Sequence, residues 1–486
     1  MIADQKITKR IVISSLVWKF LERGGVQGVQ FLLSVVLARL VSPADYGVVA
    51  LLLVFIQIAN VFVQIGFSSA LIQRKESDDI DFSSVFYLSL FVSVVLYIFL
   101  FIAAPFVANF YDYSNLTLLL RVLSIVLFFG AVNSVQNAYV AKSMKFRCLF
   151  FSNIVAVLFS GLIGIIFAYK GFGVWALVFQ QLSNVVFSCV VLWLSAKWRP
   201  KLVFSFSRIK ILFNFGWKLL CSSLLDSIFK NIYNLVIGKT YSTEQLGIFD
   251  RGQQFPRVFA TNLDGAVQGV MFPTLSAYSD DVAKIKKIVR RSISSSAFVL
   301  MPCVLGLAAV ARSLVKTLLT EKWLPCVPFL QLSCITFVFY PIHTANLTAI
   351  NALGRSDISL KLEIIKKSLS LITLALTIPL GIYAMAVGQV IQNVFVSFVN
   401  AYPNKKLMDY SYFEQIKDLF PSFLLSGFMG ICVWALHFVT FFVSVPQAAL
   451  LVMQVVLGVA IYMLTAKVTK NEIFFYLVNS FKEMRR

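Results

Sequence analysis

Fourteen long apolar stretches recur along this chain of 486 residues, and they constrain its fold more than any other feature. A helix needs about 20 mostly apolar residues to cross a hydrocarbon core ~30 Å thick. Backbone donors and acceptors inside lipid can be satisfied only within the spanning structure, so each stretch is predicted to be a helix. The predicted spans are residues 11–40, 46–72, 82–107, 117–141, 148–169, 173–195, 212–238, 246–275, 292–314, 325–350, 364–382, 384–402, 419–442 and 446–466.

The composition requires a membrane environment. Hydrophobic residues make up 59% of the chain and charged residues only 13%, whereas a soluble domain carries about 25% charged residues. Forty-seven Phe against 22 acidic residues cannot all be buried in a core that still leaves a wettable surface. A cytosolic enzyme, a disordered protein and a secreted disulfide scaffold are therefore excluded. Seven Cys without metal-like spacing and two distant His predict no metal site and no cofactor.

The loop charges give the orientation. With a cytoplasmic N-terminus, thirty of the 43 Lys and Arg residues fall in inside segments and five in outside loops. A missed helix would place every later loop on the wrong side of the membrane, so this asymmetry supports fourteen spans with both termini in the cytoplasm. The basic residues are spread over eight separate segments without a nucleic-acid motif, so no nucleic-acid partner is predicted. Loops of at most about 20 residues leave no room for a soluble catalytic domain.

An internal repeat suggests the architecture. Trp18-Lys19 and Trp217-Lys218 open the first and seventh spans at an offset of 199, and Gly47 and Gly247 follow the first hairpin of each half. Six helices separate the copies, so both have the same orientation, as in parallel transporter repeats. The predicted fold is all-α, with two parallel six-helix lobes around a central cationic cleft and two extra C-terminal helices. The predicted domains are residues 1–200 (helices 1–6), 201–402 (helices 7–12) and 403–486 (helices 13–14 and a cytoplasmic tail).

Polar side chains form stripes on the helices that open each half, because they recur every three or four residues. A charge at mid-bilayer costs at least ~2.5 kcal/mol, so these stripes must face protein or water, and we predict that they line the cleft. Structural alternatives stay open: Lys19 and Lys218 can snorkel to the headgroups, and Glu22–Arg23 and Asp226–Lys230 can be ion pairs. The candidate substrate-binding residues are Lys19, Glu22, Arg23, Gln27, Gln30, Gln57, Asn60, Gln64, Lys218, Asp226, Lys230, Asp250, Arg251, Gln254, Arg257 and Asp264.

The charge balance predicts the ligand class. Eight basic and four acidic residues lie within the spans, so the cleft should favour anions. One charge pair at 4 Å is worth ~4 kcal/mol at an effective dielectric near 20. Several cations can therefore offset the dehydration of a diphosphate, while Gln and Asn bind sugar hydroxyls. The carboxylates are isolated and no Gly-rich phosphate loop is present, so a transporter is predicted and no catalytic residue is assigned.

The chain also resembles a known family. The carrying segments are WKFLERGGVQGVQF (18–31), ARLVSPADYG (38–47), GFSSALIQ (66–73), LGIFDRG (246–252) and NALGRSD (351–357). They are similar to blocks of the bacterial polysaccharide flippases in the multidrug/oligosaccharidyl-lipid/polysaccharide exporter superfamily, in particular the subgroup of colanic-acid and teichuronic-acid exporters.

The resemblance implies a function. A member would translocate undecaprenyl-diphosphate-linked oligosaccharide across the cytoplasmic membrane by alternating access, for lipopolysaccharide or exopolysaccharide biosynthesis. By analogy with the peptidoglycan-precursor flippases, Arg23 falls where a cavity arginine is expected. The superfamily often couples transport to H⁺ or Na⁺, and a polysaccharide polymerase with its assembly machinery is the implied partner. The alternatives are a multidrug exporter of the same fold and a membrane-embedded glycan polymerase or ligase.

Overall fold

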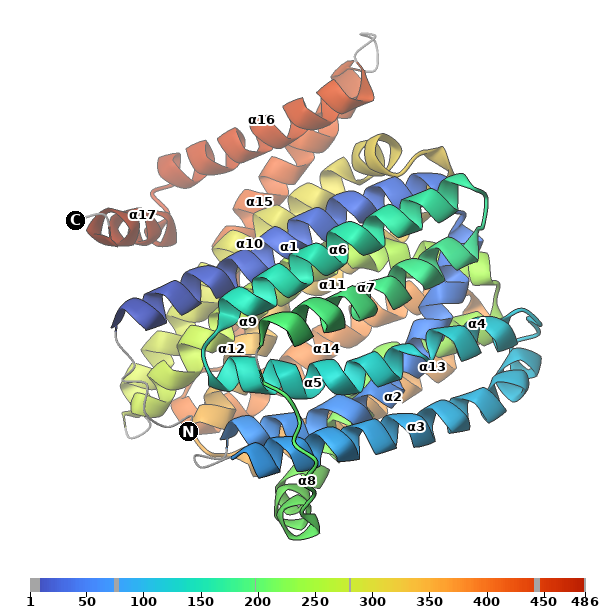
Figure 1. Ribbon diagram of the computed structural model, residues 1–486. Helices are drawn as coiled ribbons and strands as arrows, with labels where there is room; N and C mark the ends of the chain where they lie inside the picture. Colours follow the sequence, from blue (N-terminus) through green and yellow to red (C-terminus); the bar gives the residue numbers. More distant parts are fainter. Residues whose placement is uncertain (1–8, 74–77, 197, 279–280, 441–445, 485–486) are drawn as a thin grey trace. The chain divides into compact units, whose positions relative to one another are not determined.

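Helices form almost the whole chain in the computed structural model (Figure 1). Within the part of the chain that the structure describes, every regular element is a helix. The described residues are 9–73, 78–196, 198–278, 281–440 and 446–484, and the side chains of 9–17, 19–23, 65–70, 72–73, 211–212, 214–215, 218, 437–440, 481 and 484 are not among them.

The chain divides into two compact units, residues 1–247 and 248–486. The first unit holds α1 (Lys9–Leu40), α2 (Pro43–Gln73), α3 (Asp79–Phe110), α4 (Leu116–Leu123), α5 (Val126–Lys142), α6 (Phe146–Tyr169), α7 (Val174–Ser195), α8 (Phe206–Thr240) and the first turn of α9 (Thr243–Ala277). The second unit holds the rest of α9, α10 (Val282–Leu318), η1 (Glu321–Cys326), α11 (Val327–Phe337), α12 (Tyr340–Ala352), α13 (Ser356–Thr377), η2 (Ile378–Leu380), α14 (Ile382–Met408), α15 (Tyr412–Thr440), α16 (Gln447–Val468) and α17 (Glu472–Met484). The predicted boundary between lobes near residue 200 stays a prediction.

Within the described residues, helices occupy most of each of the fourteen predicted spans, and the fourth and tenth are interrupted. The fourth span consists of α4 and α5, which meet at Ser124 and Ile125. The tenth consists of η1 with α11 and then α12, and it bends by 40° at the break. Among the described residues, nine helices are long and apolar enough to cross a membrane, or ten if this bent pair is one span. A multi-pass membrane fold is therefore confirmed, while the layout of fourteen crossing helices stays a prediction.

The helix boundaries repeat where the sequence does. The helix α1 ends at Leu40 and α8 at Thr240, and the helices that follow begin at Pro43 and Thr243. The hydroxyl of Ser42 accepts from the backbone N–H of Asp45 at 3.2 Å, and the hydroxyl of Ser242 accepts from that of Gln245 at 3.1 Å. In each copy the serine satisfies a donor that the first helical turn leaves unpaired.

Inside the first unit, α3 is tied to α8. Asp78 and Asp81 form a capping box at the start of α3. The Arg208 guanidinium donates to Asp78 at 2.8 Å and to Asp81 at 3.2 Å. Partial burial raises the pKa of Asp78, but the N–H of Asp81 and the charge of Arg208 outweigh this and leave the pKa below its usual range. This ion pair fixes the first turn of α8 against the start of α3, and α8 then packs along α2.

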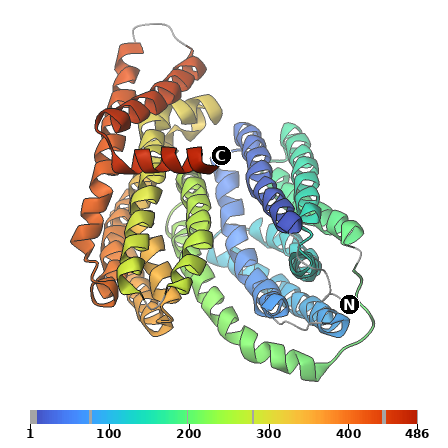
Figure 2. The same cartoon turned by 90° about the vertical axis from the view of Figure 1, so that its left-hand side faces the viewer.

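In the second unit α10 packs along α15, and α16 contacts both. Figure 2 shows these helices running together, with α17 drawn in dark red across their direction. The core between them contains Phe298, Met429, Val433 and Tyr462, and the Tyr462 hydroxyl donates to the Phe298 carbonyl at 2.8 Å. These contacts hold the C-terminal helices against α10.

Candidate functional site

The predicted stripe of the first unit is described only in part. The side chains of Lys19, Glu22, Arg23 and Lys218 lie outside the described residues, so their place in a cleft stays a prediction. The side chains of Gln27 and Gln30 are exposed on α1.

A hydrogen bond joins the stripe between α2 and α8. The Asn231 amide on α8 donates to Gln57 Oε1 on α2 at 3.1 Å and to the Ser227 carbonyl at 2.9 Å. One turn further along α2, Gln64 donates to Asn60 at 3.3 Å. Exposed amides within a membrane-spanning helix require protein or water as neighbours, because lipid offers no hydrogen bonds. This face is therefore a polar surface of the first unit.

Two further charged residues of the predicted set lie on α8. Lys230 is exposed, and Asp226, one turn earlier, is half-buried. The structure thus places Gln57, Asn60, Gln64, Asp226 and Lys230 on the packed pair of helices α2 and α8.

On α9, Arg251 is buried, with 3% of its surface exposed. Its Nη1 donates to Gln254 Oε1 at 2.6 Å, and the guanidinium lies 5.7 Å from the ring of Phe255 and 5.8 Å from that of Trp323. A guanidinium over aromatic faces is stabilised by the ring quadrupoles. Arg251 therefore holds α9 against η1, and α9 also carries Arg257 and Asp264. Asp250 beside it is half-buried.

Nearly two helical turns further along α9, the exposed cation of Arg257 is held by amides. Arg257 Nη2 donates to Gln253 Oε1 at 3.0 Å, and Gln253 Nε2 donates to Gln389 Oε1 on α14 at 2.9 Å. Because the chain of hydrogen bonds ends on neutral amides, the charge of Arg257 is oriented without being neutralised by them. Such a cation can bind an anion.

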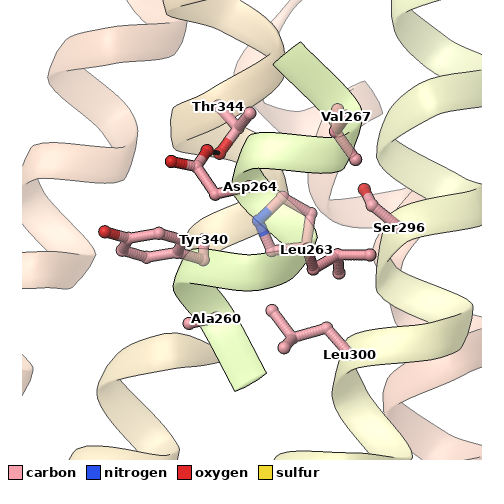
Figure 3. Close-up of a pocket in the computed structure, with 9 residues that line it drawn as sticks. Ala260, Leu263, Asp264, Val267, Ser296, Leu300, Tyr340 and Thr344 are labelled. Atoms are coloured by element: carbon pink, nitrogen blue, oxygen red, sulfur yellow. Dashed lines mark hydrogen bonds between the residues drawn. The ribbon is translucent and has the colours of Figure 1, made fainter. Parts of the chain in front are cut away.

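Asp264 lies on the same helix, about four turns beyond Asp250. Its carboxylate accepts from the Thr344 hydroxyl on α12, and from Gln268 Nε2 at 3.1 Å. Figure 3 shows Asp264 beside Thr344 and Tyr340, with Ser296 and Leu300 of α10 on the other side of a small cavity. The cavity of about 10 Å³ has room for roughly one water molecule. No group of three His, Cys, Asp or Glu side chains that could hold a metal occurs in the described ranges.

A buried amide network lies deeper in the second unit. Asn346 on α12 donates to Gln415 at 2.7 Å and accepts from Asn404. His343 is hydrogen-bonded through Nδ1 to Asn400 at 2.9 Å. Buried polar groups must be paired in this way, so the network fixes α12, α14 and α15 against one another.

The sequence matches a family over more than half of its length. Residues 36–328 match the family described as "Polysaccharide biosynthesis protein". The chain belongs to this family. The prediction of a polysaccharide biosynthesis flippase or exporter is thereby confirmed at the level of the family.

Three curated relatives carry related names. The chain is 24% identical to the teichuronic acid biosynthesis protein TuaB of Bacillus subtilis, over 83% of this chain and 84% of that protein. It is 22% identical to the lipopolysaccharide biosynthesis protein WzxC of Escherichia coli, over 85% of each. The succinoglycan biosynthesis transport protein ExoT of Rhizobium meliloti is 24% identical over 69% of each chain.

Solved structures agree on the fold. The lipid II flippase MurJ in its inward closed conformation superposes with a TM-score of 0.75 and 15% identity, over 95% of this chain and 99% of that chain. An inward-facing MATE family multidrug transporter gives a TM-score of 0.63 and 19% identity, over 78% and 94%. Both show that this family member has the polytopic helical fold of these transporters.

Several residues of the site are absent from the predicted set. Asn231, Gln253, Thr344 and Gln389 contact predicted residues but were not singled out. Gln253 precedes Arg257 by four residues, so helical spacing could have identified it. Thr344 and Gln389 come from α12 and α14, and their proximity to α9 depends on tertiary packing that a single sequence does not reveal.

Proposed function

We propose that this family member translocates a lipid-linked oligosaccharide with a diphosphate head, such as undecaprenyl-diphosphate oligosaccharide, across the cytoplasmic membrane by alternating access. The observation that carries the proposal is the polar face of α9, where the guanidinium of Arg257 donates to the neutral amide of Gln253 and forms no ion pair within the described residues. Relatives named for teichuronic acid, succinoglycan and lipopolysaccharide synthesis support a glycan substrate, and the MurJ fold supports flipping of a lipid carrier.

The chemistry of the substrate predicts separate paths for its lipid tail and its charged head. Removing a polyprenyl tail from lipid would cost up to ~0.8 kcal/mol per CH₂ group. The tail therefore stays in the bilayer, and only the charged head and its sugars need a polar path. Amides such as Gln57 and Asn231 can bind sugar hydroxyls, while cations bind the diphosphate. The excess of basic over acidic residues in the spans favours an anion over the lipophilic cations of a drug exporter.

The finer layout is part of the proposal. We infer fourteen crossing helices, a bacterial inner membrane location, both termini in the cytoplasm, and a transporter without catalytic residues. The distribution of Lys and Arg over the loops supports this orientation. A polysaccharide polymerase and its assembly machinery would then act on the translocated product.

Coupling to H⁺ or Na⁺ is also proposed, with Asp264 as the coupling group. Its support is a half-buried carboxylate that touches both Thr344 and a cavity inside a membrane-spanning unit, since such carboxylates commonly mark ion pathways. In proteoliposomes, wild-type transport should respond to a gradient of one of these ions, and Asp264→Asn should remove that response. A normal response in Asp264→Asn would reject this assignment and leave the flippase proposal standing.

The function is tested by depleting the protein from host cells. Undecaprenyl-diphosphate oligosaccharide should accumulate on the cytoplasmic face of the membrane, and one surface polymer should be lost. A membrane-impermeant glycan-labelling reagent should then reach the accumulated lipid only after cell lysis. An unchanged distribution of the lipid-linked glycan, together with sensitivity to cationic drugs, would replace the proposal with a multidrug exporter.

A further inference from the structure

A large cavity lies in the second unit, away from the polar face of α9. It measures about 950 Å³ and is formed by α10, α15 and the turn between α16 and α17. Basic side chains from all three places line it, namely Lys287, Arg290 and Arg291 of α10, Lys417 of α15, and Lys470 of the turn. All five belong to segments that the loop charges predict to be cytoplasmic.

The helix α17 closes one side of this cavity. Its first turn is capped by Asn471, whose Oδ1 accepts from the backbone N–H groups of Ile473 and Phe474 at 3.0 and 3.2 Å. Ile473, Phe474 and Leu477 pack on the core around Phe298. The helix therefore presents an apolar face to α10 and runs across it, as Figure 2 shows. An amphipathic helix in this orientation is typical of the membrane interface.

The arginines of the cavity already have partners. Arg290 Nη2 contacts Asp418 at 2.7 Å. The Arg291 guanidinium lies 3.4 Å from the ring of Tyr476 and so attaches α17 to α10. Both side chains thus act in part as structural braces.

The lysines of the cavity differ from the arginines. Within the described residues, no carboxylate lies within ion-pair distance of Lys287, Lys417 or Lys470. With Asp418 and Glu472 as the acidic lining residues, five basic groups leave three positive charges in excess. A surplus of positive charge gathered in one cavity favours the binding of an anion, because the like charges repel each other.

The remaining wall is apolar and continues onto the outer surface of α15. Leu424 lines the cavity and is 53% exposed, and its neighbours Phe420 and Phe423 are 53% and 42% exposed. Large exposed apolar side chains on a membrane-spanning helix face lipid. The basic lining of the cavity is therefore continuous with the lipid-facing surface of α15.

We propose that this cavity binds the headgroup of an anionic glycerophospholipid of the inner leaflet, with Lys287, Lys417 and Lys470 on its phosphate and its acyl chains along Leu424 and Phe420. Basic pockets between helices at the cytoplasmic face suit such headgroups. The bound lipid would hold α17 at the interface. A free phosphate would leave the apolar wall unused. This inference concerns a bilayer lipid, so it does not depend on the translocated substrate.

The test uses the full chain purified in detergent and titrated with phosphatidylglycerol, followed by native mass spectrometry. The variant Lys287→Gln/Lys417→Gln/Lys470→Gln should bind phosphatidylglycerol roughly 10- to 100-fold more weakly than the wild type, because each lysine near a lipid phosphate contributes about a factor of five. The matched control is Lys361→Gln/Lys405→Gln/Lys406→Gln, which removes three exposed lysines from the same unit outside the cavity. It should bind like the wild type.

Three further arms decide the source of the anion. The wild type should bind phosphatidylcholine more weakly than phosphatidylglycerol, and inorganic phosphate should fail to displace phosphatidylglycerol. Equal binding of phosphatidylcholine and phosphatidylglycerol by the wild type, or an equal loss in the control variant, would overturn the proposal. Bound phosphatidylglycerol can also be challenged with undecaprenyl diphosphate. If undecaprenyl diphosphate binds the cavity more tightly than phosphatidylglycerol does, the proposal is overturned, because the cavity would then belong to the substrate path. A thermal unfolding curve matching that of the wild type shows that the variant has folded.

Discussion

Gly47 on α2 and Gly247 on α9 meet backbone to backbone at a point where neither position has room for a Cβ atom. A Cβ on Gly47 would lie 1.6 Å from the carbonyl oxygen of Thr243, and one on Gly247 would lie 2.0 Å from that of Pro43. The two glycines occupy the same place in the internal repeat. The start of the second helix in each half therefore contacts its own counterpart, and this close approach requires glycine at both positions.

This contact predicts that Gly47→Ala and Gly247→Ala each destabilise the protein. The new methyl group must displace a backbone carbonyl rather than a flexible side chain, and overpacking of this kind costs about 1–3 kcal/mol. Lower thermal stability and lower membrane yield should be measured for both variants. Gly427→Ala, where a Cβ would meet nothing within 4 Å, should match the wild type. Wild-type stability in both test variants would show that the helices can separate without cost.

The polar face of α9 gives a prediction for transport. Arg257→Gln keeps a hydrogen-bonding side chain beside Gln253 but removes the charge. Because a hydrogen bond to a charged group contributes about 1.5–3 kcal/mol, export of the surface glycan should fall at least about tenfold. The protein level in the membrane should not change, and this is checked by immunoblotting.

The matched control is Arg121→Gln on α4. Arg121 Nε donates to the Phe101 carbonyl at 3.2 Å, and its guanidinium lies 4.0 Å from the Phe101 ring, so its role is to join α3 and α4. Export should persist in this variant. If both variants export normally, Arg257 does not bind the substrate.

The helices could be predicted from the sequence because lipid requires long apolar segments with internally paired backbones. The breaks at Ser124 and at Val338 could not, since they depend on a few local hydrogen bonds. The structure places several residues of the predicted stripes on α2, α8 and α9, and their role in lining a cleft stays a prediction. The stripes did not reveal that Arg251 is buried against Trp323, because that neighbour comes from a distant segment. The short helix α17 was missed because it lies below the length of a span.

The link between α3 and α8 predicts a pH dependence. The pKa of Asp78 lies below its ordinary value of 3.8 in the folded protein. The stabilisation is therefore fully present above pH 3.8 and is lost as the pH falls through the folded-state pKa. Arg208→Gln removes the neighbouring charge and brings the folded-state pKa of Asp78 closer to its ordinary value, so stability at neutral pH should fall and acidification below pH 3.8 should cost less than in the wild type. Thermal unfolding measured across acidic pH checks this, and a stability profile equal to that of the wild type would show that the ion pair does not stabilise the fold.

The buried amide network gives the last prediction. Asn346→Leu keeps a similar volume but leaves Asn404 and Gln415 without their shared partner in the core of the second unit. Each buried group that loses its hydrogen bond costs about 1–3 kcal/mol, so the free energy of unfolding should fall by several kcal/mol. Asn137→Leu, at an exposed position of α5, is the control and should change little. Equal stability of the two variants in thermal unfolding would mean that packing alone, rather than the amides, holds α12 against α14 and α15.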